Sequence, residues 1–414
     1  MMYIPKEIIV AKDVKTHPVT CSILDKCPGV PVRVVDSNQP DVIRKASHIL
    51  SNSDGLAETI CLGKHVLAVV STTDVIKRFD MPDSRVGCPH FMKLVMATNG
   101  CPYNCTWCYL RLTYRDLYPC IVVRVRYEHI TKKIERYVRK ISVPTTFNMG
   151  ELQDGLALEH LTGAAQVLIP FFGQLKNGYL FILTKSDNVE PTLRLQHNGH
   201  TFVCWSINAP EISATFEIGA PSFDRRLTAA KRVQKAGYPL RIRLDPIVPV
   251  PNWKKIYGDT VKRIFNEVKP ERITIGTLRF EEEFYKNRYA LVGQKSSGRK
   301  LLIEMDKFQP MLPSMQVPTG RQDKTGEQKM KSSIGKYSYP QKLRLEMFSF
   351  IISEIRKYFD GPIALCKEVR SLWLAVGLDP RHCRCVCQFD EANLLNGNES
   401  VHAGTHLPRN KTLV

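Results

Sequence analysis

The sequence between residues 200 and 250 contains three successive segments: HTFVCWSI (200–207), SFDRRLTAAKRVQKAG (222–237) and LRIRL (240–244). The first and third are apolar and typical of buried strands. The middle segment has helical spacing and ends at Gly237, a residue suited to the position just after a helix. Together they predict a strand, a helix and a second strand, which is the repeating unit of a parallel sheet.

Similar units extend on both sides of this stretch. We expect strands at 93–97, 121–125, 144–149, 179–184 and 272–278, and helices at 129–141, 156–168, 257–268 and 343–358. Five or six such units favour a partial α/β barrel, a fold whose chemistry lies at the C-terminal ends of its strands. The fold class is therefore α/β.

Three regions follow from this pattern. Residues 1–90 are expected to form a small N-terminal α/β extension, 91–285 the partial barrel, and 286–414 a C-terminal region with a helix and a cysteine-rich cap. Within the last region, GQKSSGRK and TGRQDKTGEQKMKSSIGK predict a basic loop or hairpin. That segment is either a solvated loop or a contact for nucleic acid.

Composition limits the class of protein. The chain has 414 residues, 43% hydrophobic and 24% charged, as expected of a globular protein. Its net charge of +19 favours polyanionic partners such as DNA, although a soluble protein can simply be basic. No apolar run is long enough for a membrane helix, and the N-terminus does not resemble a signal peptide. We therefore expect a cytoplasmic protein whose 13 cysteines are mostly thiols or metal ligands.

The segment CPYNCTWCY (101–109) places Cys101, Cys105 and Cys108 in a loop directly after an expected strand. Thiolates select zinc or iron–sulfur clusters. A closed zinc site usually has four ligands, and no fourth cysteine or histidine follows closely. Three thiolates can instead hold three corners of a cubane, which leaves one iron open. A zinc knuckle or unliganded thiols are the alternatives.

This triad, with an aromatic residue before its last cysteine, resembles the radical S-adenosylmethionine (SAM) superfamily. The stretches NGCPYNCTWCYL, WSINAPEISATFEIGAPSFDRRLTAAKRVQKAGYPLRIRLDPIVPV and IGKYSY are similar to the spore photoproduct lyase family. The resemblance implies a 4Fe-4S cluster that cleaves SAM to a 5′-deoxyadenosyl radical, and a lyase that repairs a thymine photoproduct in DNA. We also expect a reducing partner such as flavodoxin or ferredoxin.

Several residues are candidates for binding SAM. Ser206 and Asn208 are two residues apart at a strand end and so share a face; the resemblance matches them to a SAM-binding element, and capping of the strand end is the alternative. Lys185 could neutralise the methionine carboxylate or be an exposed lysine. Trp107 could pack near the adenine or belong to the core.

The substrate side has fewer candidates. The resemblance implies that Tyr109 takes part in a radical relay, whereas a core position is the alternative. Arg243 and Asp245 could face the mouth of the barrel or form a structural ion pair.

The sequence departs from the family at one position. The lyases carry a hydrogen-donor cysteine near the end of the next barrel strand, and this chain has FNMGELQD (147–154) there, with Glu151 at or near that position. Either the chain does not repair the spore lesion or another thiol substitutes. Cys204 is a candidate because it shares the face of Ser206, although a small buried cysteine is the simpler interpretation.

A second group of cysteines lies near the C-terminus. Cys366, Cys383, Cys385 and Cys387 could form an auxiliary iron–sulfur or zinc site, with His382 as a weaker candidate, or they could remain unliganded. The alternatives to DNA repair are a radical SAM enzyme acting on RNA or a peptide, and a zinc-stabilised nucleic-acid-binding module without catalysis.

Overall fold

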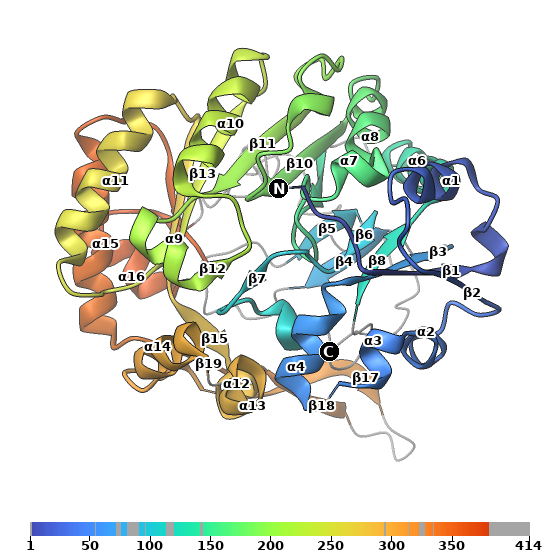
Figure 1. Ribbon diagram of the computed structural model, residues 1–414. Coiled ribbons are helices and arrows are strands. Elements are labelled where there is room, and N and C mark those ends of the chain that lie inside the picture. Colours follow the sequence, from blue (N-terminus) through green and yellow to red (C-terminus); the bar gives the residue numbers. More distant parts are fainter. Residues whose placement is uncertain are drawn as a thin grey trace.

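A computed structural model of the protein describes residues 2–380, except residues 54, 72–75, 81–90, 96, 113–119, 141–143, 294, 314, 323–327 and 334. Two large sheets dominate it, and Figure 1 shows them beside each other, with the N-terminal sheet at the right. No helix among these residues is long and apolar enough to cross a membrane.

The larger sheet forms the partial barrel. Its strands are, in spatial order, β20 (Ile363–Leu365), β14 (Arg272–Thr277), β13 (Leu240–Ile247), β11 (Thr201–Ser206), β10 (Gly178–Thr184), β9 (Thr145–Met149), β5 (Phe91–Val95) and β4 (Ile76–Asp80). Every neighbouring pair is parallel except β4 and β5. From β5 to β20 the spatial order equals the chain order, as in a barrel that winds in one direction. The predicted fold class is confirmed.

Helices cover the outer face of this curled sheet (Figure 1). They are α6 (Tyr127–Val138), α8 (Ala164–Phe172), α10 (Phe223–Lys235), α11 (Trp253–Glu267) and α15 (Gln341–Arg356). The side chain of Ser222 caps α10 by accepting a hydrogen bond from the Arg225 amide, and Gly237 follows the helix with φ +89°. The local signals in the sequence therefore set both ends of this helix.

The helix expected at 156–168 is broken. The chain forms α7 (Glu159–Thr162), turns at Gly163 with φ +63°, and continues as α8. The buried carboxylate of Glu159 accepts hydrogen bonds from the amides of Ala165 and Gln166, so it caps the second helix.

The smaller sheet has the order β2 (Val32–Val35), β1 (Glu7–Ala11), β3 (Val66–Val70), β8 (Ile121–Arg124) and β6 (Thr98–Asn99). The first four are parallel, and β6 is antiparallel to β8. Around it lie η1 (Lys12–Val14), α1 (Pro18–Asp25), α2 (Pro40–Ala46), α3 (His48–Ser51) and α4 (Leu56–Gly63). The strand expected at 121–125 is present, but it pairs with this sheet and not with the barrel. Its fully buried, β-branched residues suit either sheet, so the sequence alone did not distinguish them.

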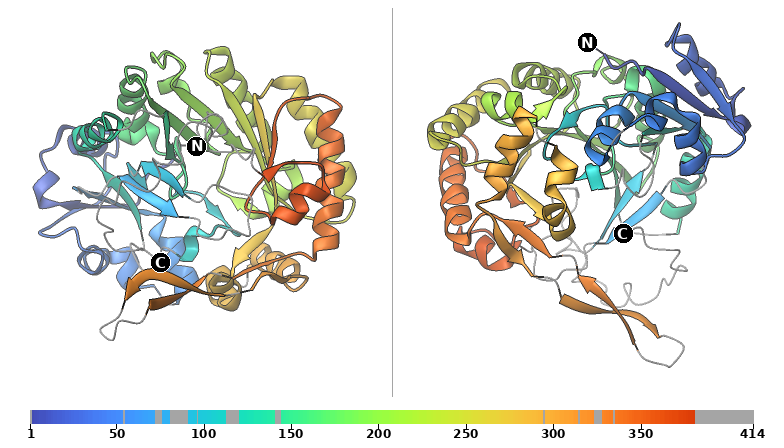
Figure 2. Two further views of the ribbon diagram at one scale, coloured as in Figure 1. Left: turned by 180° about the vertical axis from the view of Figure 1, so that it is seen from behind. Right: turned by 60° about the horizontal axis from the view of Figure 1, so that its bottom comes forward.

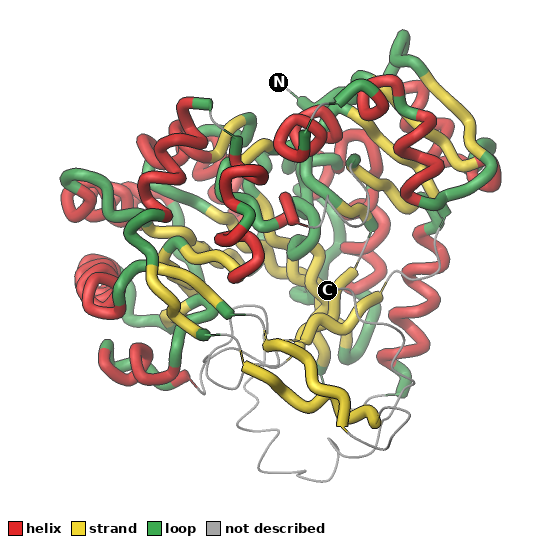
Figure 3. Tube along the Cα trace, turned by 90° about the horizontal axis from the view of Figure 1, so that it is seen from below, coloured by secondary structure: helices red, strands yellow, loops and turns green. Residues whose placement is uncertain are grey.

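The C-terminal region closes one side of the barrel. It contains β15 (Arg279–Glu281), α12 (Glu282–Lys286), α13 (Arg288–Val292), α14 (Ser296–Met305), β16 (Gln309–Leu312), β17 (Met315–Gln322), β18 (Gln328–Ser333), β19 (Lys336–Ser338) and α16 (Arg370–Ala375). The hairpin of β17 and β18 extends away from the body, as Figures 2 and 3 show. The hairpin expected in TGRQDKTGEQKMKSSIGK is confirmed. The loop or hairpin expected in GQKSSGRK is wrong, because α14 begins there at Ser296; Ser297 and Gly298 interrupt the apolar pattern of that helix.

Candidate active site

One cavity lies at the C-terminal ends of the barrel strands. It is lined by residues at or just after six neighbouring strands: Gly150, Lys185, Ser206, Asp245, Thr277 and Cys366. Parallel strands end at the same edge of a sheet, so residues up to 216 positions apart in the sequence meet here. The cysteine loop after β5 forms the opposite wall.

All three cysteines of the triad line this cavity; Cys105 is buried, and Cys101 and Cys108 are half-buried. Two contacts hold the loop from different parts of the chain. The short strand β7 (Asn104–Cys105) pairs with β12 (Glu217–Ile218), and the Lys64 ammonium donates a hydrogen bond of 2.8 Å to the carbonyl of Cys101. No motif in the sequence singled out Lys64, which comes from the N-terminal region.

A buried arginine completes the support of the loop. Arg111 donates hydrogen bonds to Oδ1 of Asn104 at 2.7 Å and to the carbonyl of Leu291 at 3.0 Å. Arg111 therefore links the cysteine loop to α13.

The thiols are suited to binding a positively charged group. Burial raises the pKa of Cys105 to about 12, and the neighbouring charges of Glu217 and Cys108 raise this pKa while that of Lys185 lowers it. Burial also raises the pKa of Cys101, and the other two cysteines contribute to that shift. Burial thus disfavours the thiolate forms, and positively charged iron bound at the sulfurs would stabilise them.

The donor set fits an iron–sulfur cubane. No three His, Cys, Asp or Glu side chains in the described part of the chain are grouped to hold a single metal ion. The three thiols line one cavity, and a cubane takes each thiolate on a different iron. The rest of the cavity leaves space beside them.

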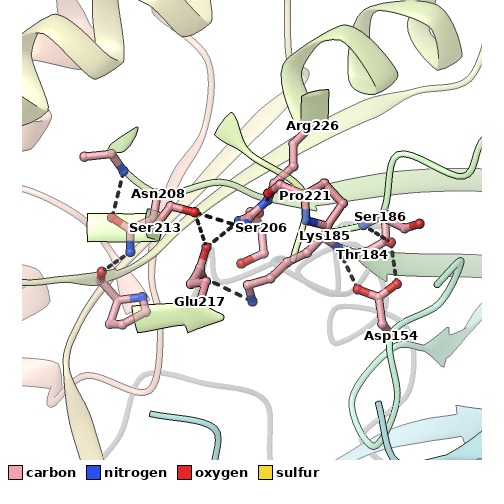
Figure 4. A network of polar contacts seen from close by, with 12 residues as sticks. Asp154, Thr184, Lys185, Ser186, Ser206, Asn208, Ser213, Glu217, Pro221 and Arg226 are labelled. Carbon is pink, nitrogen blue, oxygen red and sulfur yellow. Dashed lines mark hydrogen bonds and ion pairs between the residues drawn. The ribbon is translucent and has the colours of Figure 1, made fainter. Parts of the chain in front are cut away.

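Lys185 lies next to this wall and belongs to a buried polar network (Figure 4). Its Nζ lies 3.6 Å from Oε1 of Glu217, whose other oxygen pairs with Arg226 and accepts a hydrogen bond from Ser213. Burial by itself would raise the pKa of Glu217, but Arg226 and Lys185 lower it, so Glu217 is ionised. Burial likewise would lower the pKa of Lys185, but Glu217 raises it. The cavity therefore holds a positive charge beside the triad.

Asp154 fixes the backbone of Lys185. Its carboxylate accepts hydrogen bonds from the Lys185 amide at 2.7 Å, the Thr184 hydroxyl at 2.6 Å and the amides of Leu156 and Ala157. Figure 4 shows the Asp154 side chain pointing toward Thr184 and Lys185. It ties the loop after β9 to β10, and no motif in the sequence singled it out.

The other SAM-binding candidates fall into two groups. Ser206 and Trp107 line the cavity, and the Trp107 ring packs against Phe216 with centroids 4.9 Å apart. Asn208 is buried and is not a lining residue. Its side chain donates to the carbonyl of Pro246 at 2.7 Å and accepts from the Tyr257 hydroxyl at 3.1 Å, so it holds the strand ends together.

Of the substrate-side candidates, some line the cavity and one does not. Tyr109 lines the cavity, and its hydroxyl donates to the carbonyl of Glu151. Glu151 lines it as well, 3.8 Å from Nζ of Lys367. Cys204 is 2% exposed and is not a lining residue. Of strand β11, only the last residue, Ser206, lines the cavity.

The far wall carries further charged groups. Arg243 and Asp245 both line the cavity, as the sequence indicated, but Asp245 pairs with Arg279 at 3.0 Å. Burial by itself would raise the pKa of Asp245, but Arg279 lowers it to about 2. Cys366 lies beside this pair and accepts a hydrogen bond from Nη2 of Arg279 at 2.9 Å.

The expected second metal site cannot be assembled from the described residues. Cys366 borders the same cavity as the triad, whereas His382, Cys383, Cys385 and Cys387 lie outside the described residues. The auxiliary site remains a prediction.

A parallel partial barrel with a three-cysteine loop in front of its strand ends defines a radical SAM enzyme. The spore photoproduct lyase family model matches residues 75–364, and the chain belongs to that family. Enzymes of the family use a 4Fe-4S cluster and SAM, so the zinc-stabilised binding module is not favoured.

Three curated relatives are named spore photoproduct lyase. The Clostridium acetobutylicum protein is 25% identical over 308 residues, which cover 73% of this chain and 83% of the relative. The Geobacillus protein is 29% identical over 264 residues, which cover 63% of this chain and 72% of the relative. The Bacillus subtilis protein is 35% identical over 166 residues, which cover 40% of this chain and 48% of the relative.

Solved structures share the fold. A spore photoproduct lyase complexed with dinucleoside spore photoproduct has a TM-score of 0.71 at 23% identity, covering 88% of this chain and all of the other. A variant of such a lyase with bound AdoMet and the dinucleoside also has a TM-score of 0.71, at 22% identity.

Proposed function

We propose that this chain acts on a thymine photoproduct in DNA, with the cavity at the barrel strand ends as its active site. The observation that carries the proposal is that the three thiols, Lys185 and Ser206 line the same cavity. When bound, the cluster and SAM supply a carbon radical that takes a hydrogen atom from the substrate. The relatives' structures with a dinucleoside photoproduct and the net charge of +19 support a DNA substrate.

The residues have distinct roles in this proposal. Cys101, Cys105 and Cys108 would hold the cluster. Lys185 would bind the methionine carboxylate, since its ammonium is kept charged and in place by Glu217. Ser206 would donate a hydrogen bond to the same ligand.

Two aromatic residues complete the arrangement. Trp107 would contact the adenine, and Tyr109 would face the substrate and exchange a hydrogen atom in the relay. Asn208 would act by holding the ends of β11 and β13 and not by touching SAM. The partner that reduces the cluster would be a flavodoxin or ferredoxin, and the enzyme would work in the cytoplasm.

The test uses anaerobically purified, iron-reconstituted protein. We expect about four irons per chain and formation of 5′-deoxyadenosine that depends on a dinucleoside spore photoproduct. Replacement of all three triad cysteines by Ala should remove the iron and the cleavage, whereas Cys21→Ala, on the exposed face of α1, should change neither. Turnover with an RNA or peptide substrate and with no DNA lesion would reject the proposal.

A further inference from the structure

We propose that Lys64, a residue of the N-terminal region, positions the cysteine loop and supplies a positive charge that favours the reduced form of the cluster. The inference rests on the proposed function, because it takes Cys101, Cys105 and Cys108 as the cluster ligands. The family model matches the chain from residue 75 onward, so Lys64 lies outside the part that this match covers.

The first argument is the place of the ammonium. Lys64 directly follows α4, and its side chain reaches the cysteine loop, where Nζ donates a hydrogen bond of 2.8 Å to the carbonyl oxygen of Cys101. Lysine is among the residues least often buried in proteins, yet Lys64 is 4% exposed. A buried cation therefore lies against the first cysteine of the triad.

The second argument is that α4 contacts the same loop at another point. Sγ of Cys61, three residues before Lys64, accepts a hydrogen bond of 3.2 Å from Nδ2 of Asn104. Asn104 directly precedes Cys105. The end of α4 therefore holds the loop both at Cys101 and next to Cys105.

The third argument is that a further segment supports the loop together with α4. The helix α13 contacts α4, and Arg111 joins α13 to the loop through the carbonyl of Leu291 and Oδ1 of Asn104. Three segments that are distant in the sequence thus meet around the cysteine loop. Lys64 is the residue through which the N-terminal region reaches the backbone of a proposed cluster ligand.

The charge of Lys64 acts on the electron that the cluster accepts. Reduction adds one negative charge to a cluster that is already held by three thiolates. A nearby cation attracts this added charge, and burial strengthens the attraction because little water screens it. Net charge is one of the quantities that set the reduction potential of an iron–sulfur cluster. Lys64 should therefore raise this potential, which makes electron transfer from the reducing partner more favourable.

The main test is a reductive titration of the iron-reconstituted protein without SAM, followed by electron paramagnetic resonance. Lys64→Gln removes the charge and keeps an amide that can donate a hydrogen bond. At the wild-type midpoint potential, the ratio of reduced to oxidised cluster should fall at least fivefold, which for one electron is about 41 mV. Lys64→Arg keeps the charge and should stay within twofold of the wild type. A ratio within twofold of the wild type in Lys64→Gln would overturn the role of the charge.

The release of iron to a chelator under anaerobic conditions measures how firmly the loop holds the cluster. Lys64→Met removes both the charge and the hydrogen bond and keeps an unbranched side chain. Loss of a group that orients a metal ligand typically costs about 10–100-fold in metal affinity. We therefore expect iron release at least tenfold faster than in the wild type, with Lys64→Gln between the two. An unchanged rate in Lys64→Met would show that Lys64 does not position the loop.

Lys12→Met is the matched control. It removes the same charge from the N-terminal region, but the Lys12 side chain is 72% exposed, so water and salt screen it. This variant should change neither the potential nor the rate of iron release. A shift as large as that of Lys64→Gln would mean that the net charge of the protein acts and the position of Lys64 does not, and the proposal would be wrong.

Failure of this inference differs from failure of the proposed function. If the variant with all three triad cysteines replaced by Ala keeps its iron, the triad does not hold the cluster and both proposals are wrong. If the wild type binds about four irons and forms substrate-dependent 5′-deoxyadenosine, but Lys64→Gln matches it in potential and in iron release, only the role of Lys64 is wrong. Lys64→Gln decides this even if Lys64→Met does not fold.

Discussion

The ammonium of Lys185 lies 3.6 Å from Oε1 of Glu217, a carboxylate without exposed surface whose second oxygen is bound by Arg226. One buried acid thus serves two cations, one of which borders the cavity. Arg226 further donates to the carbonyl of Ser206, so the network also supports the end of β11.

Glu217→Gln should destabilise the protein and weaken SAM binding. Loss of one partner of a buried ion pair costs about 3–5 kcal/mol, because the remaining charge stays buried. Urea unfolding and equilibrium dialysis with SAM measure the two effects. Glu211→Gln, an exposed acid on α9 (Pro210–Phe216), is the matched control and should change neither quantity. Unchanged stability of Glu217→Gln would contradict the role given to the pair.

Asp154→Ala should affect Lys185 through the backbone. The substitution leaves two amides, a hydroxyl and the Lys185 amide without their acceptor, at a cost of about 2–4 kcal/mol. We expect a higher KM for SAM along with the lower stability. Asp259→Ala removes an exposed acid on α11 and should have little effect on either. A normal KM in Asp154→Ala would show that Lys185 keeps its place without this support.

Gly150→Ala should displace the backbone just after β9, where Gly150 lines the cavity. An added Cβ would lie 2.5 Å from Cβ and 2.6 Å from the carbonyl oxygen of Leu183, so the backbones of β9 and β10 would have to separate. Overpacking of this kind costs about 1–3 kcal/mol. Gly258→Ala, on α11 with its nearest contact at 3.6 Å, should leave the protein as stable or more stable. Equal melting temperatures for the two variants would refute the close contact.

Acidification should weaken the contact between the N-terminus and the α7 region. Burial lowers the pKa of His160 below 6.5, and its ring contacts the carbonyl of Tyr3 at 2.7 Å and the Asn188 amide at 3.1 Å. The unfolded chain therefore takes up the proton first, so this contribution is complete above pH 6.5 and declines as the pH falls below it.

Thermal unfolding of wild type and His160→Asn at pH 7.5 and 5.5 measures this contribution. The variant should lose less stability between the two pH values. His65 and His197 also have a lowered pKa, so part of the dependence should remain. An identical pH dependence in both proteins would exclude His160 as a contributor.

Local pattern predicted most of the barrel. Strands β9, β10, β11, β13 and β14 and helices α6, α10, α11 and α15 lie within a few residues of their expected bounds, because each combines an apolar face with a turn signal at its end. The pattern placed the strand at 121–125 among the barrel units, and this was wrong, since a buried parallel strand has the same composition in either sheet. It also missed α14, whose first turn is polar.

The triad and the strand ends that carry Lys185 and Ser206 could be predicted from the amino-acid pattern, because three thiols within eight residues and polar residues after apolar strands are local features. The distant side chains that act on them could be identified only in the folded chain: Glu217 and Arg226 beside Lys185, Lys64 on the Cys101 carbonyl, and Arg279 on Cys366. Charge pairing and burial depend on distances in space, and the curled sheet sets those distances by bringing the C-terminal ends of its parallel strands to one edge.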